Sequence, residues 1–171
     1  MMLETERLSL RPLTLSDAEL LFPIMNDAEV MAHWDVPKVE DPELIRMIVA
    51  SQVSDMDGGK AYHWAIRHLR DDAFLGVCDL SDIDRWHKRG EIGFLFGRDA
   101  WGQGYGQEAM GAVISHAAHM GVRKLAARTH LGNRRSDALL EKLGFKQEGL
   151  LRGHVLRDGE RRDVRLFGIL L

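Results

Sequence analysis

Three glycines separated by single residues follow an apolar run and precede a predicted helix, in the segment FLFGRDAWGQGYGQEAM at residues 94–110. A strand that ends in such a loop directs unpaired backbone N–H groups toward one point, and the dipole of the following helix adds partial positive charge there. Pyrophosphate and other anions bind at such helix N-termini. Gly102, Gly104 and Gly106 carry no Cβ, so a ligand can approach their backbone closely. The segment therefore predicts a pyrophosphate-binding loop, the alternative being a loop that needs glycine only for its turns.

Two other phosphate-binding motifs explain this loop less well. Gly104-x-Gly106-x-x-Ala109 satisfies the loose dinucleotide fingerprint, which belongs to a parallel βαβ unit with an acidic residue about 20 positions further on. Here the preceding strands are predicted to be antiparallel, and the next strand ends at Thr129-His130 rather than at an acidic residue. A Walker A loop is excluded because the sequence contains no Gly-Lys-Ser/Thr.

The elements that position the loop follow from the spacing of apolar residues and from turn signals. Their order is β, α, α, β, β, β, α, β, α, β, β, which predicts one α/β domain over residues 1–171 with a mixed, mostly antiparallel sheet of about seven strands and four helices. Helices are expected from Ser16 (in a capping box with Glu19), from Asp41-Pro42, from the glycine loop to Gly121, and from Asn133 to Gly144; strands are expected near 7–11, 61–68, 73–82, 91–97, 122–131, 145–156 and 160–171, the last two joined at Asp158-Gly159.

Composition narrows the class of protein further. The chain has 171 residues, of which 45% are hydrophobic, so it can bury a core, and no apolar run is long enough to span a bilayer. A net charge of −3 gives no reason to expect direct binding of nucleic acid. The single cysteine, Cys78, is expected to be a buried small hydrophobe, and with the absence of a secretory signal it favours a cytoplasmic location.

Four segments of the chain resemble the GNAT acetyltransferases. Trp101-Gly102-Gln103-Gly104-Tyr105-Gly106 is similar to their pyrophosphate loop, written R/Q-x-x-G-x-G/A. TERLSLRPL at 5–13, GEIGFLF at 90–96 and NRRSDALLEKLGFKQEGLLR at 133–152 resemble the opening strand, the central strand and the asparagine helix of the branch that acetylates ribosomal-protein N-termini. The resemblance covers nearly the whole chain and implies a GNAT-like sheet splayed at its central strands.

The resemblance also implies a site for acetyl-CoA. Trp101 departs from the first motif position, but an aromatic residue there is familiar in this branch, and backbone amides bind the phosphates. The central strand would pair with the pantetheine arm, and one of its N–H groups could stabilise the oxyanion. Asn133 would hold the arm through its side chain; the alternative is an ordinary N-cap, and both roles can hold at once. The implied cofactor-binding residues are Phe94, Leu95, Phe96, Trp101, Gly102, Gln103, Gly104, Tyr105, Gly106, Asn133 and Ser136, with Arg134, Arg135 and Lys142 as candidates for the 3′-phosphate.

The candidate acid follows from the same resemblance. Many members of the family use a tyrosine seven residues after the asparagine, and this position is Leu140 here. In the branch resembled, the proposed donor is a serine three residues after the asparagine, which matches Ser136. Ser136 is therefore predicted either to protonate the departing thiolate or only to hydrogen-bond the sulfur.

The first candidate for the general base is Glu91, at the start of the central strand. The alternative is a turn salt bridge between Glu91 and Lys88 or Arg89. Asp79 and Asp82 on the neighbouring strand are the next candidates. A protein N-terminal amine, with a pKa near 8, needs little help, so a dedicated base is not required.

The acceptor is expected between the first helices and the last hairpin. His33, Trp34 and Asp79 are the predicted substrate-binding residues. The arginines of the last hairpin would either receive an acidic protein tail or form a solvated, self-paired face. No metal is expected, because His116-x-x-His119 lacks further ligands and is interpreted as a surface pair.

These observations predict an N-acetyltransferase that moves an acetyl group from acetyl-CoA to a primary amine by direct attack in a ternary complex. The acceptor would be a protein N-terminus or a small-molecule amine. The alternatives are a polyamine or antibiotic acetyltransferase, a non-catalytic CoA-binding sensor and, third, a nucleotide-binding regulator. The C-terminal strands would allow a homodimer.

Overall fold

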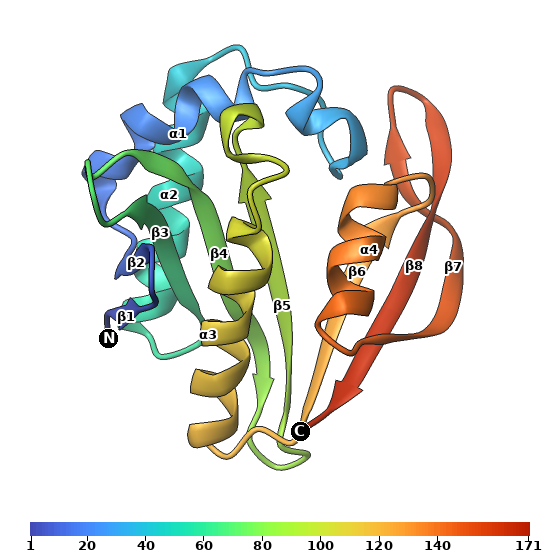
Figure 1. Ribbon diagram of the computed structural model, residues 1–171. Coiled ribbons are helices and arrows are strands. Elements are labelled where there is room, and N and C mark those ends of the chain that lie inside the picture. The colour runs from blue at the N-terminus through green and yellow to red at the C-terminus, as the bar shows by residue number, and fades with distance from the viewer.

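The computed structural model describes residues 1–171 and contains one open, eight-stranded sheet in the order β1-β2-β3-β4-β5-β6-β8-β7 (Figure 1). All neighbouring strands are antiparallel except β5 and β6. The strands are β1 (Leu3–Glu4), β2 (Leu8–Pro12), β3 (Tyr62–His68), β4 (Phe74–Asp84), β5 (Arg89–Phe96), β6 (Lys124–His130), β7 (Lys146–Arg157) and β8 (Glu160–Leu170). The helices are α1 (Ala18–Met25), α2 (Pro42–Asp57), α3 (Tyr105–His119) and α4 (Arg134–Lys142).

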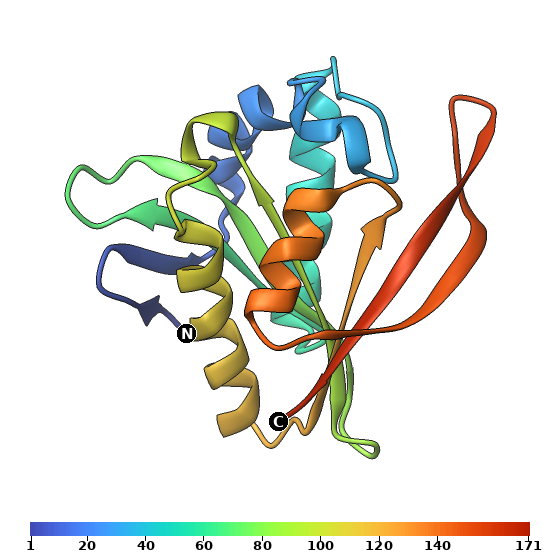
Figure 2. The same cartoon turned by 45° about the vertical axis from the view of Figure 1, so that its right-hand side comes forward.

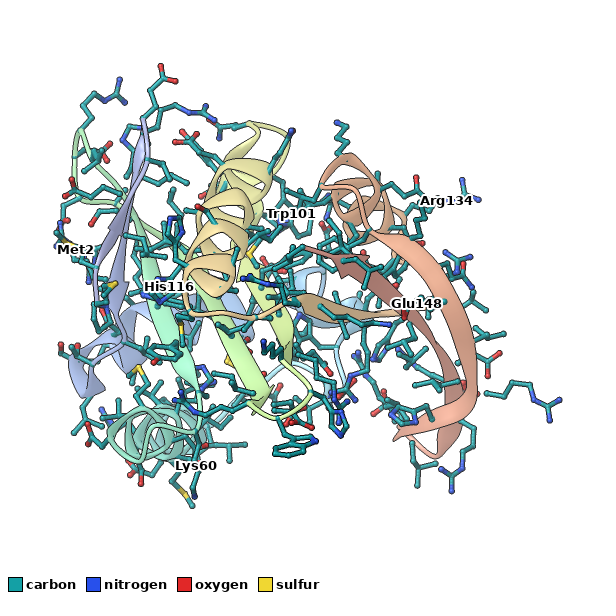
Figure 3. All side chains as sticks on the ribbon, turned by 90° about the horizontal axis from the view of Figure 1, so that it is seen from below. Met2, Lys60, Trp101, His116, Arg134 and Glu148 are labelled. Carbon is teal, nitrogen blue, oxygen red and sulfur yellow. The ribbon has the colours of Figure 1, made fainter.

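Helices cover both faces of the sheet. Figure 2 shows α3 and α4 in front of it and α2 behind, and Figure 3 places Lys60, just after α2, and His116, on α3, on opposite sides. Each face therefore has its own apolar core. The core under α3 and α4 includes Trp64, Leu80, Met110, Leu125 and Leu140, and the core under α1 and α2 includes Leu21, Met31, Ile45, Val49 and Leu95.

Several element boundaries predicted from the sequence are confirmed. The Asp41 carboxylate accepts a hydrogen bond from the Glu43 N–H at 2.9 Å and caps α2, with Pro42 in the first turn. Asp158 and Gly159 have φ angles of 53° and 79°, the left-handed pair that a two-residue hairpin between β7 and β8 requires. Cys78 is buried, and burial raises the pKa of its thiol.

The predicted fold class is confirmed, and the sheet has eight strands where about seven were expected, because the short β1 pairs with β2. Two local predictions were wrong. The first helix does not begin with a Ser16–Glu19 capping box. A 3₁₀ turn over Leu15–Asp17 comes first, and the Asp17 carboxylate accepts from the Thr14 N–H at 2.8 Å.

His116 is the second wrong prediction, since it is not an exposed surface residue. Its ring is partly buried and packs edge-on against Tyr62 and Trp64, with centroids 5.7 and 5.8 Å away.

No group of three or more His, Cys, Asp or Glu side chains is arranged to hold a metal ion. None of the helices combines the length and apolar character needed to cross a membrane.

The sheet splays between β5 and β6, as predicted. The two strands pair in parallel only where Arg89–Glu91 meets Lys124–Ala126. Beyond Glu91 they separate, and Figure 1 shows the gap between β5 and the half of the molecule formed by β6, β8, β7 and α4. The side of Phe94–Phe96 that faces β6 is therefore an unpaired strand edge.

Candidate active site

A cavity of about 280 Å³ lies on the α3–α4 side of the splay. Its walls come from four segments: the end of β5, the glycine loop with the first turn of α3, α4, and the 3₁₀ turn at Val30–His33 with its flanking residues. Of the predicted cofactor-binding residues, the cavity is lined by Phe94, Leu95, Phe96, Trp101, Gly102, Gly104, Tyr105, Gly106, Asn133 and Ser136. Gln103 is the exception: it is not among the lining residues, and its side-chain amide donates to the Asp99 carbonyl at 2.7 Å.

The glycine loop presents free backbone donors to this cavity. Gly102 and Gly104 have φ angles of 73° and 80°, a conformation that favours glycine. The N–H groups from Gln103 to Gln107 donate to no carbonyl, as is usual for the first turn of a helix. Arg135 and Lys142 add positive charge to the same cavity. This set of donors and cations fits a diphosphate such as that of coenzyme A.

A salt bridge between distant segments holds the loop in place. Glu108, in the first turn of α3, accepts from Nε and the backbone N–H of Arg7 at 2.7 and 2.8 Å. Nη1 of Arg7 donates to the Gln103 carbonyl at 3.0 Å, and the guanidinium lies 4.6 Å from the centroid of Tyr105. Sequence reasoning missed both charged residues, because they lie 101 positions apart.

Trp101 connects the two sides of the cavity. Its indole N–H donates to the Phe96 carbonyl at 3.0 Å, and the guanidinium of Arg135 lies 3.4 Å above the centroid of its ring. This geometry gives a physical reason for tryptophan at the first motif position: one side chain binds the end of β5 and stacks against α4.

Helix α4 is fixed on the sheet by polar contacts. Asn133 caps it, since its Oδ1 accepts from the Ser136 N–H at 3.3 Å, so the N-cap interpretation holds. The buried Asp137 accepts from the Thr129 hydroxyl at 2.7 Å and from Arg165. Leu140 is fully buried in the core, so the position of the usual tyrosine acid points away from the cavity.

A second cavity, of about 250 Å³, lies next to the first one. All three predicted substrate-binding residues, His33, Trp34 and Asp79, line it, and so does Glu91. The two cavities share His33, Trp34, Phe94, Asn133 and Ser136. Ser136 therefore lies where a ligand in one cavity would meet a ligand in the other.

Of the three candidate bases, Asp82 does not line this cavity, and the other two differ in their partners. Glu91 does not pair with Lys88 or Arg89, as the alternative interpretation expected, but accepts from Nε of Arg128 on β6 at 2.7 Å. Asp79 accepts only from the Ser81 hydroxyl, at 2.8 Å. Burial raises the pKa of Asp79 to about 6, against the lowering effect of the Ser81 hydrogen bond.

The last hairpin holds the part of the second cavity's wall that is formed by His33–Asp35. The guanidinium of Arg157, with a side chain only 9% exposed, donates to the carbonyls of Met31, Ala32 and Trp34. Arg162 also donates to the Ala32 carbonyl, at 3.1 Å. Arg157 also pairs with Asp158 of the same hairpin at 3.5 Å, but these two arginines are not merely part of a solvated face, which was one of the two interpretations of the sequence. They fix the 3₁₀ turn at Val30–His33 that carries His33.

Comparisons with known proteins agree with this geometry. Residues 7–146 match the family model described as an acetyltransferase (GNAT) domain. The chain is 32% identical over 170 residues to the uncharacterized N-acetyltransferase p20 of Bacillus licheniformis, covering 98% of this chain and 95% of that protein. It is 27% identical to the ribosomal-protein-serine acetyltransferase of Escherichia coli, covering 78% and 74% of the two chains. The structure of RimL, a ribosomal L7/L12 alpha-N-protein acetyltransferase in complex with coenzyme A, superposes with a TM-score of 0.91 at 22% identity, covering 100% and 98%.

Proposed function

This chain belongs to the GNAT acetyltransferase family and is an N-acetyltransferase, and we propose that it transfers acetyl from acetyl-CoA to the α-amine of a protein N-terminus. The observation that carries the proposal is the meeting of two cavities at Ser136. One has the donors for a diphosphate; the other is lined by polar side chains and is open to an acceptor. Two substrates can therefore lie in one ternary complex.

Each part of the cofactor cavity has a role in this proposal. The free N–H groups of the glycine loop bind the pyrophosphate, and Arg135 and Lys142 lie at hand for the 3′-phosphate. The unpaired edge of β5 at Phe94–Phe96 pairs with the amide groups of the pantetheine arm. Acetyl-CoA supplies a thioester whose carbonyl carbon is open to attack by an amine.

Ser136 lies beside the place where the thiolate would form. Its hydroxyl is proposed to donate a hydrogen bond or a proton to the departing sulfur. Position 140, where many members of the family have the tyrosine acid, is a leucine here, and its side chain is buried in the core. It therefore supplies no hydroxyl for this role. A thiolate is a good leaving group, because a thiol has a pKa near 8.5, so a weak donor suffices.

The proposed acceptor is tested by measuring release of free thiol from acetyl-CoA in the presence of peptides that begin with Ala, Ser or Met, and of spermidine. Acetylation of a peptide α-amine, located by mass spectrometry, would support the proposal. Faster turnover of spermidine than of every peptide would favour a polyamine acceptor instead. Binding of acetyl-CoA without transfer to any amine would favour the sensor alternative.

A further inference from the structure

The second cavity, in which the acceptor would bind, is called the acceptor cavity below. Asp79 is its one carboxylate that has neither an ion-pair partner nor an exposed position. It lies on β4 opposite Gly93 of β5. Its only side-chain partner is the Ser81 hydroxyl, at 2.8 Å, and it forms no salt bridge. The other two carboxylates in the cavity wall are paired, Glu91 with Arg128 and Asp35 with His130, each at 2.7 Å.

Gly93 makes room for this carboxylate. A Cβ at position 93 would lie 2.5 Å from Oδ1 of Asp79, so the carboxylate could keep this position only if it shifted. The carboxylate thus lies over the backbone of β5, one residue before Phe94, which both cavities share. A glycine inside an apolar stretch, here Ile92–Phe96, marks such a close approach.

We propose that Asp79, rather than Glu91, accepts the proton of the acceptor's ammonium group before the amine attacks. Glu91 acts as a positioning residue, because its ion pair with Arg128 connects β5 and β6 where their ladder ends. The assignment rests on the proposed function, of which it specifies one step.

The proposed step balances as follows. Asp79 takes one proton from R–NH₃⁺, and the neutral amine forms a C–N bond to the thioester carbonyl carbon. The C–S bond then breaks and the electron pair leaves with the sulfur. The second nitrogen proton passes to the thiolate, directly or by way of the Ser136 hydroxyl, and the proton on Asp79 returns to solvent. The products are the acetylated amine, free coenzyme A and one proton.

The surroundings of Asp79 suit this task. The charged and titratable groups around it are His63, opposite it on β3, Asp82 on its own strand, Glu91 on β5 and Arg128 on β6. His33, Asp35, His130 and His154 line the same cavity. Burial is the main reason why its pKa is raised to about 6, and Glu91 and Asp82 add to the effect while Arg128 opposes it. A carboxylate of this kind is charged at neutral pH but is a stronger base than an ordinary aspartate.

The test compares kcat/KM against pH for the wild type, Asp79→Asn and Glu91→Gln, with the best peptide acceptor. For the wild type, kcat/KM should rise as Asp79 loses its proton at about pH 6 and then level off. Asp79→Asn should lose about a hundredfold at pH 7. Its deficit should shrink to about tenfold at pH 9, because an α-amine with a pKa near 8 is then already neutral. Asp79→Glu should recover part of the rate.

Glu91→Gln is the matched control, because it neutralises the neighbouring carboxylate. It should keep the rise, moved to somewhat lower pH because Glu91 no longer raises the pKa of Asp79, even if its overall rate falls. Titration with acetyl-CoA should give Kd values within about twofold for all variants, which separates loss of the base from loss of the fold.

Equal rates and equal pH profiles for the wild type and Asp79→Asn would overturn the assignment. The assignment would also fail if Glu91→Gln lost the rise of kcat/KM near pH 6 while Asp79→Asn kept it. A wild type that binds acetyl-CoA but acetylates no amine would overturn the proposed function, and this step with it. The two failures are therefore distinguishable.

Discussion

Gly102 offers a direct way to test where the diphosphate binds. It has a φ angle of 73°, and a Cβ there would meet no atom within 4 Å, so a side chain at this position projects into open space beside the free N–H groups. Among residues other than glycine, Asn and Asp tolerate this left-handed conformation best. Gly102→Asn and Gly102→Asp therefore differ by one negative charge and hardly at all in shape or backbone strain.

The expected difference in binding follows from Coulomb's law. Two unit charges about 6 Å apart, in an exposed loop with an effective dielectric constant of about 60, interact with roughly 0.9 kcal/mol. A diphosphate with about two charges gives roughly 1.8 kcal/mol, which is about a twentyfold weaker binding of coenzyme A to Gly102→Asp than to Gly102→Asn. At about 0.15 M salt, screening with a Debye length near 8 Å reduces this to about fivefold.

The assay is isothermal titration of each variant with coenzyme A at low and at physiological salt. Gly59 provides the matched control, because it has a φ of 67° and open space around it but lies at the end of α2, on the opposite face of the sheet. Gly59→Asp and Gly59→Asn should lose about as much stability as the Gly102 pair, roughly 1 kcal/mol of unfolding free energy, and should bind coenzyme A equally well.

Equal Kd values for Gly102→Asp and Gly102→Asn at low salt would refute the reasoning. They would mean that no negative charge of the ligand lies near the glycine loop, whatever the fold. A ratio that persists unchanged at high salt would also contradict it, since an exposed electrostatic effect must be screened.

Three further outcomes follow from the same structure. Ser136→Ala should lower kcat about tenfold and leave the Kd for acetyl-CoA within twofold; an unchanged kcat at saturating substrate would reject it as the acid. Arg157→Met should lower the unfolding free energy by about 2–3 kcal/mol and raise the KM for the acceptor, because the carbonyls under it lose their donor, whereas Arg161→Met on the exposed side of the same hairpin should do neither. Asp79→Asn should be more stable than the wild type by about 1–2 kcal/mol at pH 8 but not at pH 3. The pKa of Asp79 is about 6 in the folded protein, against an ordinary value of 3.8. Between these two values the folded wild type binds more protons than the unfolded chain, so its stability falls as the pH rises through them. Denaturant unfolding at the two pH values checks the sign.

The features that sequence analysis predicted well depend on local patterns. The glycine loop, the cap at Asp41 and the hairpin at Asp158-Gly159 each need particular residue types within a few positions, so a short segment is enough to indicate them. The splay between β5 and β6 was predicted from resemblance, and the register confirms it. The cavity beside the glycine loop followed from two of these features, because the loop and the splayed end of β5 form part of its wall.

The sequence could not predict which charges meet. Glu91 pairs with Arg128, 37 positions away, rather than with its neighbours Lys88 and Arg89, because β6 runs beside β5 only at that end. The preference for Glu91 over Asp79 as the base failed to anticipate this pairing. One signal was available: Gly93 interrupts an apolar strand opposite Asp79 and so indicates a close approach.

The splay itself creates a problem that three side chains help to solve. Where two strands separate, each loses backbone hydrogen bonds to the other, and buried N–H and C=O groups without a partner lower the stability of the fold. The Trp101 indole satisfies the Phe96 carbonyl at the end of β5, and its ring stacks with Arg135 of α4, while Arg128 bridges to Glu91 where the ladder stops. Contacts thus lie at both ends of the opening, and the edge between them, around Phe94 and Leu95, is left for a ligand. On this argument the tryptophan at position 101 stabilises the open sheet, and the phosphate-binding role proposed for the loop rests on its free N–H groups rather than on this side chain.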